Sequence, residues 1–221
     1  MDYQVSVVGG GISGALAALY LGKSRVKTCL IDRGKPSQRL SNPYIGKTTS
    51  LNLSSIASLR DVGIWEDIKK NAQEFNEIYV WDAEGSSSVQ FKAEEISRND
   101  LGVIVHNNII LESIYSKLEQ ISEVTLIEEE SLKEISQDQN KIELTSDSGL
   151  KIASELLIGA DGSLSKVRDF SRIPIRTWSY EQLAIVSSVT TEIPLDKTAF
   201  QIFTDTGPVS YTHLRAHETR F

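Results

Sequence analysis

The stretch that decides the fold is VVGGGISG, residues 7–14, which places four glycines within eight positions. Glycine is unfavourable inside regular structure, so such a cluster indicates a sharp turn or a backbone that something large approaches closely. A β-branched run precedes it at residues 4–8, an alanine-rich helical pattern follows at 12–23, and a second strand pattern covers 26–31. These elements predict one parallel β-α-β unit with a right-handed crossover.

Gly9, Gly11 and Gly14 form the pattern GxGxxG between the predicted strand and helix. The first glycine permits the tight turn, the second lets a pyrophosphate approach the backbone, and the third lets the helix pack closely on the strand. Asp32 follows the second strand, where a carboxylate can accept hydrogen bonds from an adenosine ribose. The pattern therefore predicts a dinucleotide site, but it does not distinguish FAD from NAD. An ordinary glycine turn with an exposed aspartate is the alternative.

A second glycine motif lies in LLIGADGSLSKVR, residues 156–168. A short apolar strand leads into a GADG turn, and a helix begins soon after it. Read from the residues alone, Asp161 is available to cap that helix.

The motif GADGxxSxVR resembles a fingerprint of the FAD-dependent aromatic-ring monooxygenases of the p-hydroxybenzoate hydroxylase type. The positions that match are Gly159, Asp161, Gly162, Ser165, Val167 and Arg168. The resemblance implies that Asp161 lies near the pyrophosphates and serves both FAD and the nicotinamide nucleotide that reduces it. The cofactor-binding residues that we predict are Gly9, Gly11, Ser13, Gly14, Asp32, Arg33, Lys47, Asn107, Asp161 and Arg168.

Within that family the chain is most similar to the ubiquinone-biosynthesis hydroxylases. The similarity also rests on TTSLNLSSIASLRDVGIW (residues 48–65), DLGVIVHN (100–107), WSYEQLAIVSSV (178–189) and FTDTGPV (203–209). It implies that Asn107 heads a helix on the isoalloxazine side, and that Lys47 stands where many relatives carry an FAD-contacting Arg. A solvated loop charge at Lys47 and a simple helix cap at Asn107 are the alternatives. Trp178 and Tyr180 are predicted to be core aromatics.

The resemblance implies that NAD(P)H reduces FAD, and that a flavin C4a-hydroperoxide then hydroxylates an electron-rich ring using O₂. The resemblance implies that the substrate is a small aromatic precursor of ubiquinone, and the sequence leaves open whether that compound carries a prenyl tail. No catalytic side chain is assigned, and His106 is interpreted as structural. A non-catalytic FAD-binding protein and a pyridine-nucleotide-dependent dehydrogenase with a Rossmann core are the alternative functions.

The element pattern predicts an α/β fold: a Rossmann-like FAD-binding core, with a parallel sheet and a β-meander crossover, interleaved with a mostly β substrate domain. The core is assigned to residues 1–75 and 97–176, and part of the substrate domain to 76–96 and 177–209. Further helices are predicted at residues 50–62, 65–70 and 108–121, and strands at 77–82, 88–92, 124–127, 131–136, 141–145, 156–158 and 183–190. Residues 210–221, SYTHLRAHETRF, have no apolar period and resemble translated vector sequence. We therefore expect a non-native tail on an inactive N-terminal fragment.

Composition limits the partners. The formal charge of −7 and the absence of a basic stripe argue against nucleic acid. The single cysteine, Cys29, excludes a disulfide framework and is predicted to be a buried thiol. His213 and His217 are four residues apart but lack a third ligand, so no metal site is predicted. Short apolar runs and the early first strand predict a cytoplasmic protein, with peripheral association at the inner membrane face or in a ubiquinone-synthesis complex left open.

Overall fold

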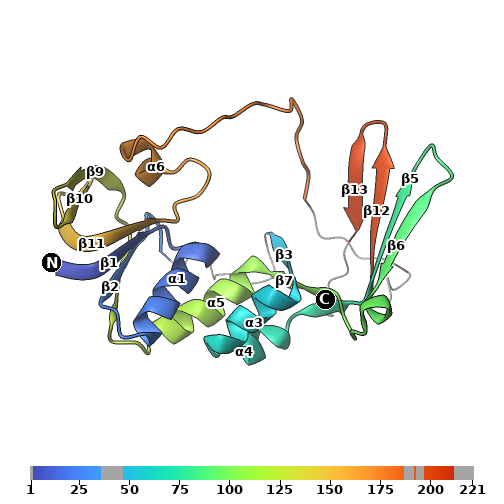
Figure 1. The fold of residues 1–221 in the computed structure, drawn as a ribbon, viewed down its shortest axis with the longest axis horizontal. Helices are drawn as coiled ribbons and strands as arrows, with labels where there is room; N and C mark the ends of the chain where they lie inside the picture. Colours follow the sequence, from blue (N-terminus) through green and yellow to red (C-terminus); the bar gives the residue numbers. More distant parts are fainter. Residues whose placement is uncertain (1, 36–46, 187–191, 193–196, 212–221) are drawn as a thin grey trace, which may run out of the picture. The chain divides into compact units, whose positions relative to one another are not determined.

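The computed structural model describes residues 2–35, 47–186, 192 and 197–211. The chain divides into two compact units, and each is built from two separate segments. The first unit comprises Met1–Tyr44 and Asn108–Leu183, and the second comprises Ile45–Asn107 and Ala184–Phe221. Figure 1 follows these segments by colour along the chain.

A six-stranded sheet forms the first unit. Its strands in spatial order are β8 (Val124–Ile127), β2 (Thr28–Ile31), β1 (Asp2–Val8), β11 (Lys151–Gly159), β10 (Ile142–Ser146) and β9 (Leu132–Gln137). The first four strands are parallel to one another, whereas β11, β10 and β9 form an antiparallel meander. The predicted Rossmann-like parallel core with a β-meander is confirmed.

The two central strands, β1 and β2, are largely buried, as is typical of parallel strands inside an α/β sheet. All four residues of β2 are buried, and Cys29 within it has no exposed surface, as predicted. Burial raises the pKa of the Cys29 thiol to about 11, so this group is inert near neutral pH. Helix α1 (Ile12–Lys23) packs on β1, β2 and β8, and helix α5 (Asn107–Leu118) buries Ile110, Ile114 and Leu118.

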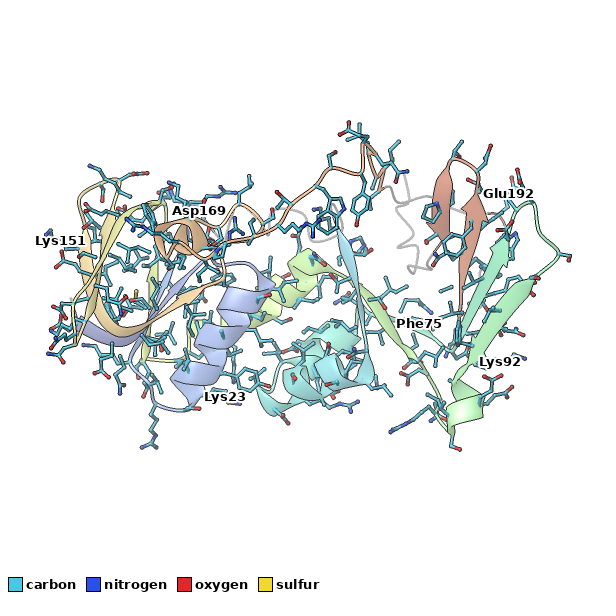
Figure 2. All side chains as sticks on the ribbon, turned by 45° about the horizontal axis from the view of Figure 1, so that its top comes forward. Lys23, Phe75, Lys92, Lys151, Asp169 and Glu192 are labelled. Atoms are coloured by element: carbon cyan, nitrogen blue, oxygen red, sulfur yellow. The ribbon has the colours of Figure 1, made fainter. Side chains whose placement is uncertain are left out.

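The register of the sheet brings the ends of three strands to one edge. Val8 at the end of β1 is paired with Ile31 at the end of β2 and with Gly159 at the end of β11. The turns that follow all three strands therefore leave the sheet side by side. At the other end of β11, the strand begins at Lys151, which is labelled in Figure 2. The Lys151 ammonium forms an ion pair of 3.0 Å with Glu143 on β10.

The second unit contains a three-stranded antiparallel sheet in the order β3 (Thr48–Leu51), β7 (Gly102–His106) and β4 (Gln73–Phe75). Two helices, α3 (Leu53–Asp61) and α4 (Trp65–Lys69), lie between β3 and β4 in the sequence, and they pack against each other. Asn52 begins α3 by accepting a hydrogen bond from the Ser55 N–H at 2.8 Å. This side-chain cap explains why the predicted helix at residues 50–62 starts later than expected.

The same unit holds a four-stranded sheet in the order β13 (Gly207–Tyr211), β12 (Thr198–Thr204), β5 (Glu77–Asp82) and β6 (Ser88–Lys92). In the sequence, the short helix η1 (Ala93–Ile96) follows β6. Tyr79, Trp81 and Phe200 gather on one face, with ring centroids 5.5–6.3 Å apart. Ser210 and Tyr211, part of the predicted non-native tail, form the end of β13, whereas residues 212–221 lie outside the described residues.

The two units divide the chain at other positions than the predicted domains. Residues 48–75 belong to the second unit, because β3 and β4 both pair with β7. These short strands were missed, since three or four residues between helices leave little periodic signal. The assignment of a cofactor domain and a substrate domain to particular residue ranges stays a prediction.

Two expectations for the segment after residue 172 are wrong. Trp178 and Tyr180 were predicted in a core, but their side chains are 63% and 76% exposed and contact each other edge to face. The strand predicted at 183–190 is not formed over residues 183–186, and 187–190 lie outside the described residues. Apolar β-branched composition favours a strand only where a partner strand is available, and residues 183–186 have none in the part of the chain that the structure describes.

His106 at the end of β7 gives the protein a predictable pH dependence. The residue is 8% exposed, and this burial lowers the pKa of His106 below its ordinary value of 6.5. The unfolded chain therefore binds a proton that the folded chain resists. We expect the contribution of His106 to the free energy of unfolding to be fully present above pH 6.5 and to be lost as pH falls from 6.5 toward the lowered pKa, by up to about 1.4 kcal/mol per pH unit.

The measurement is urea unfolding of the wild type and of His106→Gln at several pH values between about 5 and 8. The variant should lose this component of the slope, because glutamine does not titrate. Identical slopes in both proteins would show that His106 does not titrate differently on folding.

Candidate functional site

A cavity of about 340 Å³ opens in the first unit at the carboxyl edge of the parallel sheet. This volume lies in the range of small-molecule sites, and the place is where ligands bind in open α/β sheets. The segments that follow all four parallel strands contribute to its lining. The lining residues are Val8, Gly9, Gly11, Ile31, Asp32, Arg33, Glu130, Ser131, Leu132, Ala160, Asp161, Gly162, Leu164 and Lys166.

Gly9 and Gly14 allow three chain segments to meet without side chains between them. Gly9 has φ = +107°, and a Cβ built on it would collide with the backbone of Ala160 and lie 2.7 Å from the Asp161 nitrogen. A Cβ on Gly14 would collide with the Gly9 carbonyl oxygen. The first glycine therefore packs against the second motif, and the third glycine packs α1 onto the turn.

Gly11 differs from Gly9 and Gly14, because a Cβ built on it would meet nothing within 4 Å. It occupies the N-cap position of α1 with extended backbone and no side-chain cap. A helix N-terminus offers free N–H groups and a partial positive charge to anions. The space over Gly11 thus fits a pyrophosphate, and the residues present fit the phosphate-bearing part of a dinucleotide.

The Asp32 carboxylate is held by two backbone groups. Its Oδ2 accepts a hydrogen bond from the Gly10 N–H at 2.5 Å, and its Oδ1 accepts one from the Gly34 N–H at 2.8 Å. The residue is 8% exposed and still lines the cavity. Each carboxylate oxygen can accept more than one hydrogen bond, so Asp32 fixes the glycine turn and keeps capacity for ribose hydroxyls.

Asp161 lines the same cavity and caps helix α6 (Lys166–Phe170). Its Oδ2 accepts hydrogen bonds from the Lys166 and Val167 N–H groups at 2.7 and 3.2 Å, and its Oδ1 accepts one from the Ser165 hydroxyl. The capping role read from the residues alone is therefore present. The same contacts tie the GADG turn to the start of α6.

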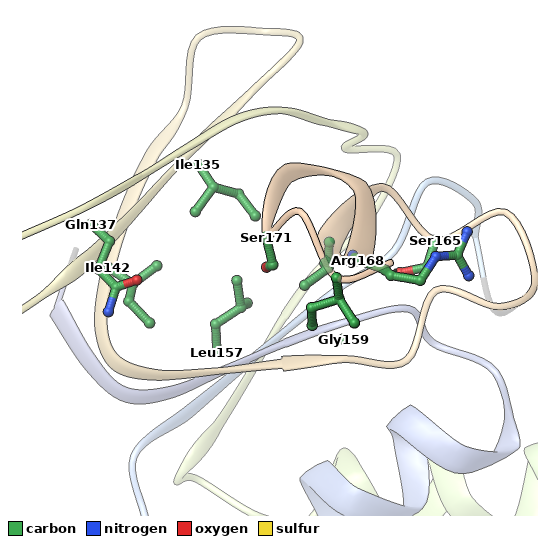
Figure 3. Close-up of a pocket in the computed structure, with 10 residues that line it drawn as sticks. Ile135, Gln137, Ile142, Leu157, Gly159, Ser165, Arg168 and Ser171 are labelled. Carbon is green, nitrogen blue, oxygen red and sulfur yellow. The ribbon is translucent and has the colours of Figure 1, made fainter. Parts of the chain in front are cut away.

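Arg168 lies elsewhere. It lines a second cavity of about 280 Å³, which is bounded by the meander and α6 and does not include the glycine turn. Figure 3 shows Ile135, Ile142 and Leu157 on one side of this cavity, with Arg168 beside Ser165 on the other. The Arg168 guanidinium donates to the Ser163 carbonyl oxygen at 3.0 Å. The structure therefore shows Arg168 bracing the GADG segment and not lining the first cavity.

The other predicted residues divide between the two units. Ser13 is exposed in the first turn of α1, and Arg33 is exposed next to Asp32 in the cavity lining. Lys47 and Asn107 lie in the second unit, where the Asn107 N–H donates to the Lys47 carbonyl oxygen at 2.9 Å. The Asn107 side chain accepts a hydrogen bond from the Thr49 hydroxyl.

Sequence reasoning missed Glu130, Lys166 and Tyr115. Glu130 lines the cavity, and hydrogen bonds from Ser146 and Ser148 lower the pKa of its carboxyl. Lys166 donates from Nζ to the Leu132 carbonyl oxygen at 3.0 Å. The position of Glu130 just beyond β8 was the available signal, because carboxyl ends of parallel strands share one edge. Tyr115 had no signal, since its partner Gly10 is 105 residues away.

Within the described ranges, no three His, Cys, Asp or Glu side chains come together as metal ligands would. His213 and His217 lie outside those ranges. None of the helices within the same ranges is long and apolar enough to cross a membrane.

Comparisons with known proteins agree with this geometry. A family model described as an FAD binding domain matches residues 2–209. The mitochondrial ubiquinone biosynthesis monooxygenase COQ6 of Caenorhabditis elegans is 30% identical over 224 residues, covering 94% of this chain and 49% of that protein. The 3-demethoxyubiquinol 3-hydroxylase of Escherichia coli K12 is 28% identical over 214 residues, covering 96% and 54%. The chain thus spans about half the length of these relatives.

Solved structures show the same fold. The crystal structure of PqsL, a probable FAD-dependent monooxygenase from Pseudomonas aeruginosa, superposes with a TM-score of 0.69 at 17% identity. The match covers 81% of this chain and 48% of PqsL. The family match and this likeness confirm the resemblance that the two glycine motifs indicated.

Proposed function

The chain belongs to the FAD binding domain family, and on that basis we propose that it forms the cofactor-binding part of an FAD- and NAD(P)H-dependent monooxygenase that acts on an aromatic ring. The observation that carries the proposal is the open space over Gly11 at the start of α1, in the cavity that Asp32 and Asp161 also line. The relatives named for ubiquinone synthesis support a ubiquinone precursor as the substrate.

The glycine turn, Asp32 and Asp161 would each have a part in holding the cofactor. The N–H groups at the start of α1 would bind the pyrophosphate, and Asp32 would accept hydrogen bonds from the adenosine ribose. Gly9 and Gly14 keep the turn close to the GADG segment, so Asp161 would lie beside the phosphates of the bound nucleotide. The protein's contribution is therefore to bind and orient the nucleotide.

The bound FAD would supply hydride acceptance from NAD(P)H and oxygen activation. No side chain of this chain is assigned as an acid or base. A flavin enzyme requires binding, orientation and exclusion of water from its protein.

The test of this function is reduction and oxygen consumption by an FAD-loaded protein of the relatives' full length, because this chain spans about half of that length. Addition of NADH or NADPH should bleach the flavin absorbance, and air should restore it with formation of a hydroxylated phenolic product. Tight binding of NAD without FAD would favour a dehydrogenase instead. Bound FAD that no nicotinamide nucleotide reduces would favour a non-catalytic flavoprotein.

Asp161→Ala should slow flavin reduction by NAD(P)H and weaken FAD binding, each by roughly tenfold or more, the scale of a lost charged hydrogen bond. The reason is that Asp161 lines the nucleotide cavity as well as capping α6. Stopped-flow absorbance measures the reduction, and a fluorescence titration measures the affinity.

Ser165→Ala is the matched control. It removes the N-cap hydroxyl, which accepts from the Arg168 N–H at 3.1 Å, but leaves the Asp161 carboxylate in place. Both variants should lose about 1 kcal/mol of stability through the weakened cap. If both also reduce flavin at the wild-type rate, Asp161 is a structural cap only.

A further inference from the structure

We propose that Tyr115 is a positioning residue for the pyrophosphate site. Its hydroxyl holds the Gly10 carbonyl group and thereby turns the N–H of Gly11 toward the phosphates of a bound dinucleotide. This inference rests on the FAD binding proposed above, and it adds a residue that lies far from both glycine motifs in the sequence.

The Gly10 peptide groups are held from two sides. Tyr115 on α5 is 4% exposed and donates its hydroxyl to the Gly10 carbonyl oxygen at 2.9 Å. The Gly10 N–H donates to Asp32 Oδ2 at 2.5 Å. A Cβ on Gly10 would collide with the Tyr115 hydroxyl and lie 2.9 Å from Asp32 Oδ2. Gly10 is therefore held by a side chain of α5 and by the carboxylate that follows β2.

The planarity of the peptide bond gives this grip a consequence for the ligand. The Gly10 carbonyl and the Gly11 N–H belong to one trans peptide, so they point in opposite directions. Because the carbonyl is directed at buried Tyr115, the N–H is directed away from α5. The open space at Gly11 is the place that a pyrophosphate would occupy.

A tyrosine is required for this task. A phenylalanine would fill nearly the same volume, but it would leave the Gly10 carbonyl without its donor, and the peptide could then rotate. Rotation of this peptide would affect ligand binding most, because an N–H donor that is already oriented loses no orientational entropy when the ligand binds. Removal of the hydroxyl should therefore affect phosphate binding more than it affects the fold.

The experiment compares Tyr115→Phe with the wild-type chain and with Ile114→Val, which trims a fully buried neighbour on the same helix. FAD and ADP affinities are measured by titration at a temperature where circular dichroism shows all three proteins folded. Tyr115→Phe should weaken both ligands by about 3- to 10-fold, the range of one hydrogen bond. Ile114→Val should keep the wild-type affinities.

The outcomes separate the tether from the function on which it rests. If the wild type binds FAD and Tyr115→Phe binds it equally well, the tether is overturned while FAD binding stands. If Ile114→Val weakens binding as much as Tyr115→Phe, Tyr115 supports only the fold, and the proposal is overturned. A wild-type chain that binds neither FAD nor ADP would overturn the proposed function together with the tether.

Discussion

Gly11→Ala will weaken FAD binding by roughly 100-fold while leaving the ligand-free fold nearly unchanged. The loss of affinity corresponds to the upper range for lost hydrogen bonds to a charged group. The backbone of Gly11 is extended, with φ = −70° and ψ = 180°, which alanine adopts without strain. A methyl group there meets no atom of the protein within 4 Å. It therefore occupies only the space that we assign to the pyrophosphate.

Stability should change little because two small effects oppose each other. Alanine is a poorer N-cap than glycine, but it also reduces the entropy of the unfolded chain. The melting temperature of the ligand-free protein should stay within about 4 °C, the shift for ~1 kcal/mol in a protein of this size. Differential scanning fluorimetry gives this temperature, and a flavin fluorescence titration gives the FAD affinity.

Gly9→Ala is the control for position within the same turn. Its φ of +107° is strained for alanine, and the new Cβ would collide with the Ala160 backbone. This variant should lose stability, by more than about 2 kcal/mol, as well as FAD. If Gly11→Ala instead lowers the melting temperature as far as Gly9→Ala and retains FAD, the assignment of the pyrophosphate to Gly11 is wrong.

Asp32→Ala should reduce FAD affinity by roughly 10- to 100-fold and destabilise the ligand-free protein by about 1.5–3 kcal/mol, the scale for hydrogen bonds to a charged acceptor. The stability loss is expected because Asp32 accepts hydrogen bonds from the Gly10 and Gly34 N–H groups. The affinity loss is expected because the same carboxylate faces the cavity and would bind the ribose. Chemical unfolding and FAD titration measure the two effects separately.

Asp138→Ala provides a control that is chemically matched to Asp32→Ala. Asp138 also accepts two backbone hydrogen bonds, from the Asn140 and Lys141 N–H groups at 2.8 Å each. It stands in the exposed turn between β9 and β10, and it does not line the nucleotide cavity. Its loss should affect stability alone. Unchanged FAD affinity in Asp32→Ala would refute the ribose assignment.

The parallel core could be predicted from the sequence because its signals are local. The strand before Gly9 and the helix at residues 12–23 follow from short-range periodicity and turn residues, and so does the antiparallel strand pair at residues 77–92 of the second unit. The structure has all of them at or near the predicted bounds. The convergence of Asp32 and Asp161 could also be expected, since both follow parallel strands of one sheet. Here the register of β1 with β2 and β11 produces it.

Long-range contacts could not be predicted in the same way. Nothing near Tyr115 in the sequence indicates that its hydroxyl contacts Gly10, and nothing near Arg168 shows that it lines a different cavity from Asp161. The exposure of Trp178 and Tyr180 was missed because aromatic residues are usually buried, and burial depends on which distant segment covers them. Sequence patterns state which face is apolar, but they do not state what packs on it.

The central claim is that the cavity at Gly9, Asp32 and Asp161 holds the ADP half of FAD. The most direct measurement is an equilibrium titration of the chain with FAD, followed by flavin fluorescence and repeated in the presence of ADP. Saturable binding of one FAD per chain, displaced competitively by ADP, is the predicted result. FAD fluorescence that shows no saturable change, or bound FAD that ADP does not displace, would contradict the account.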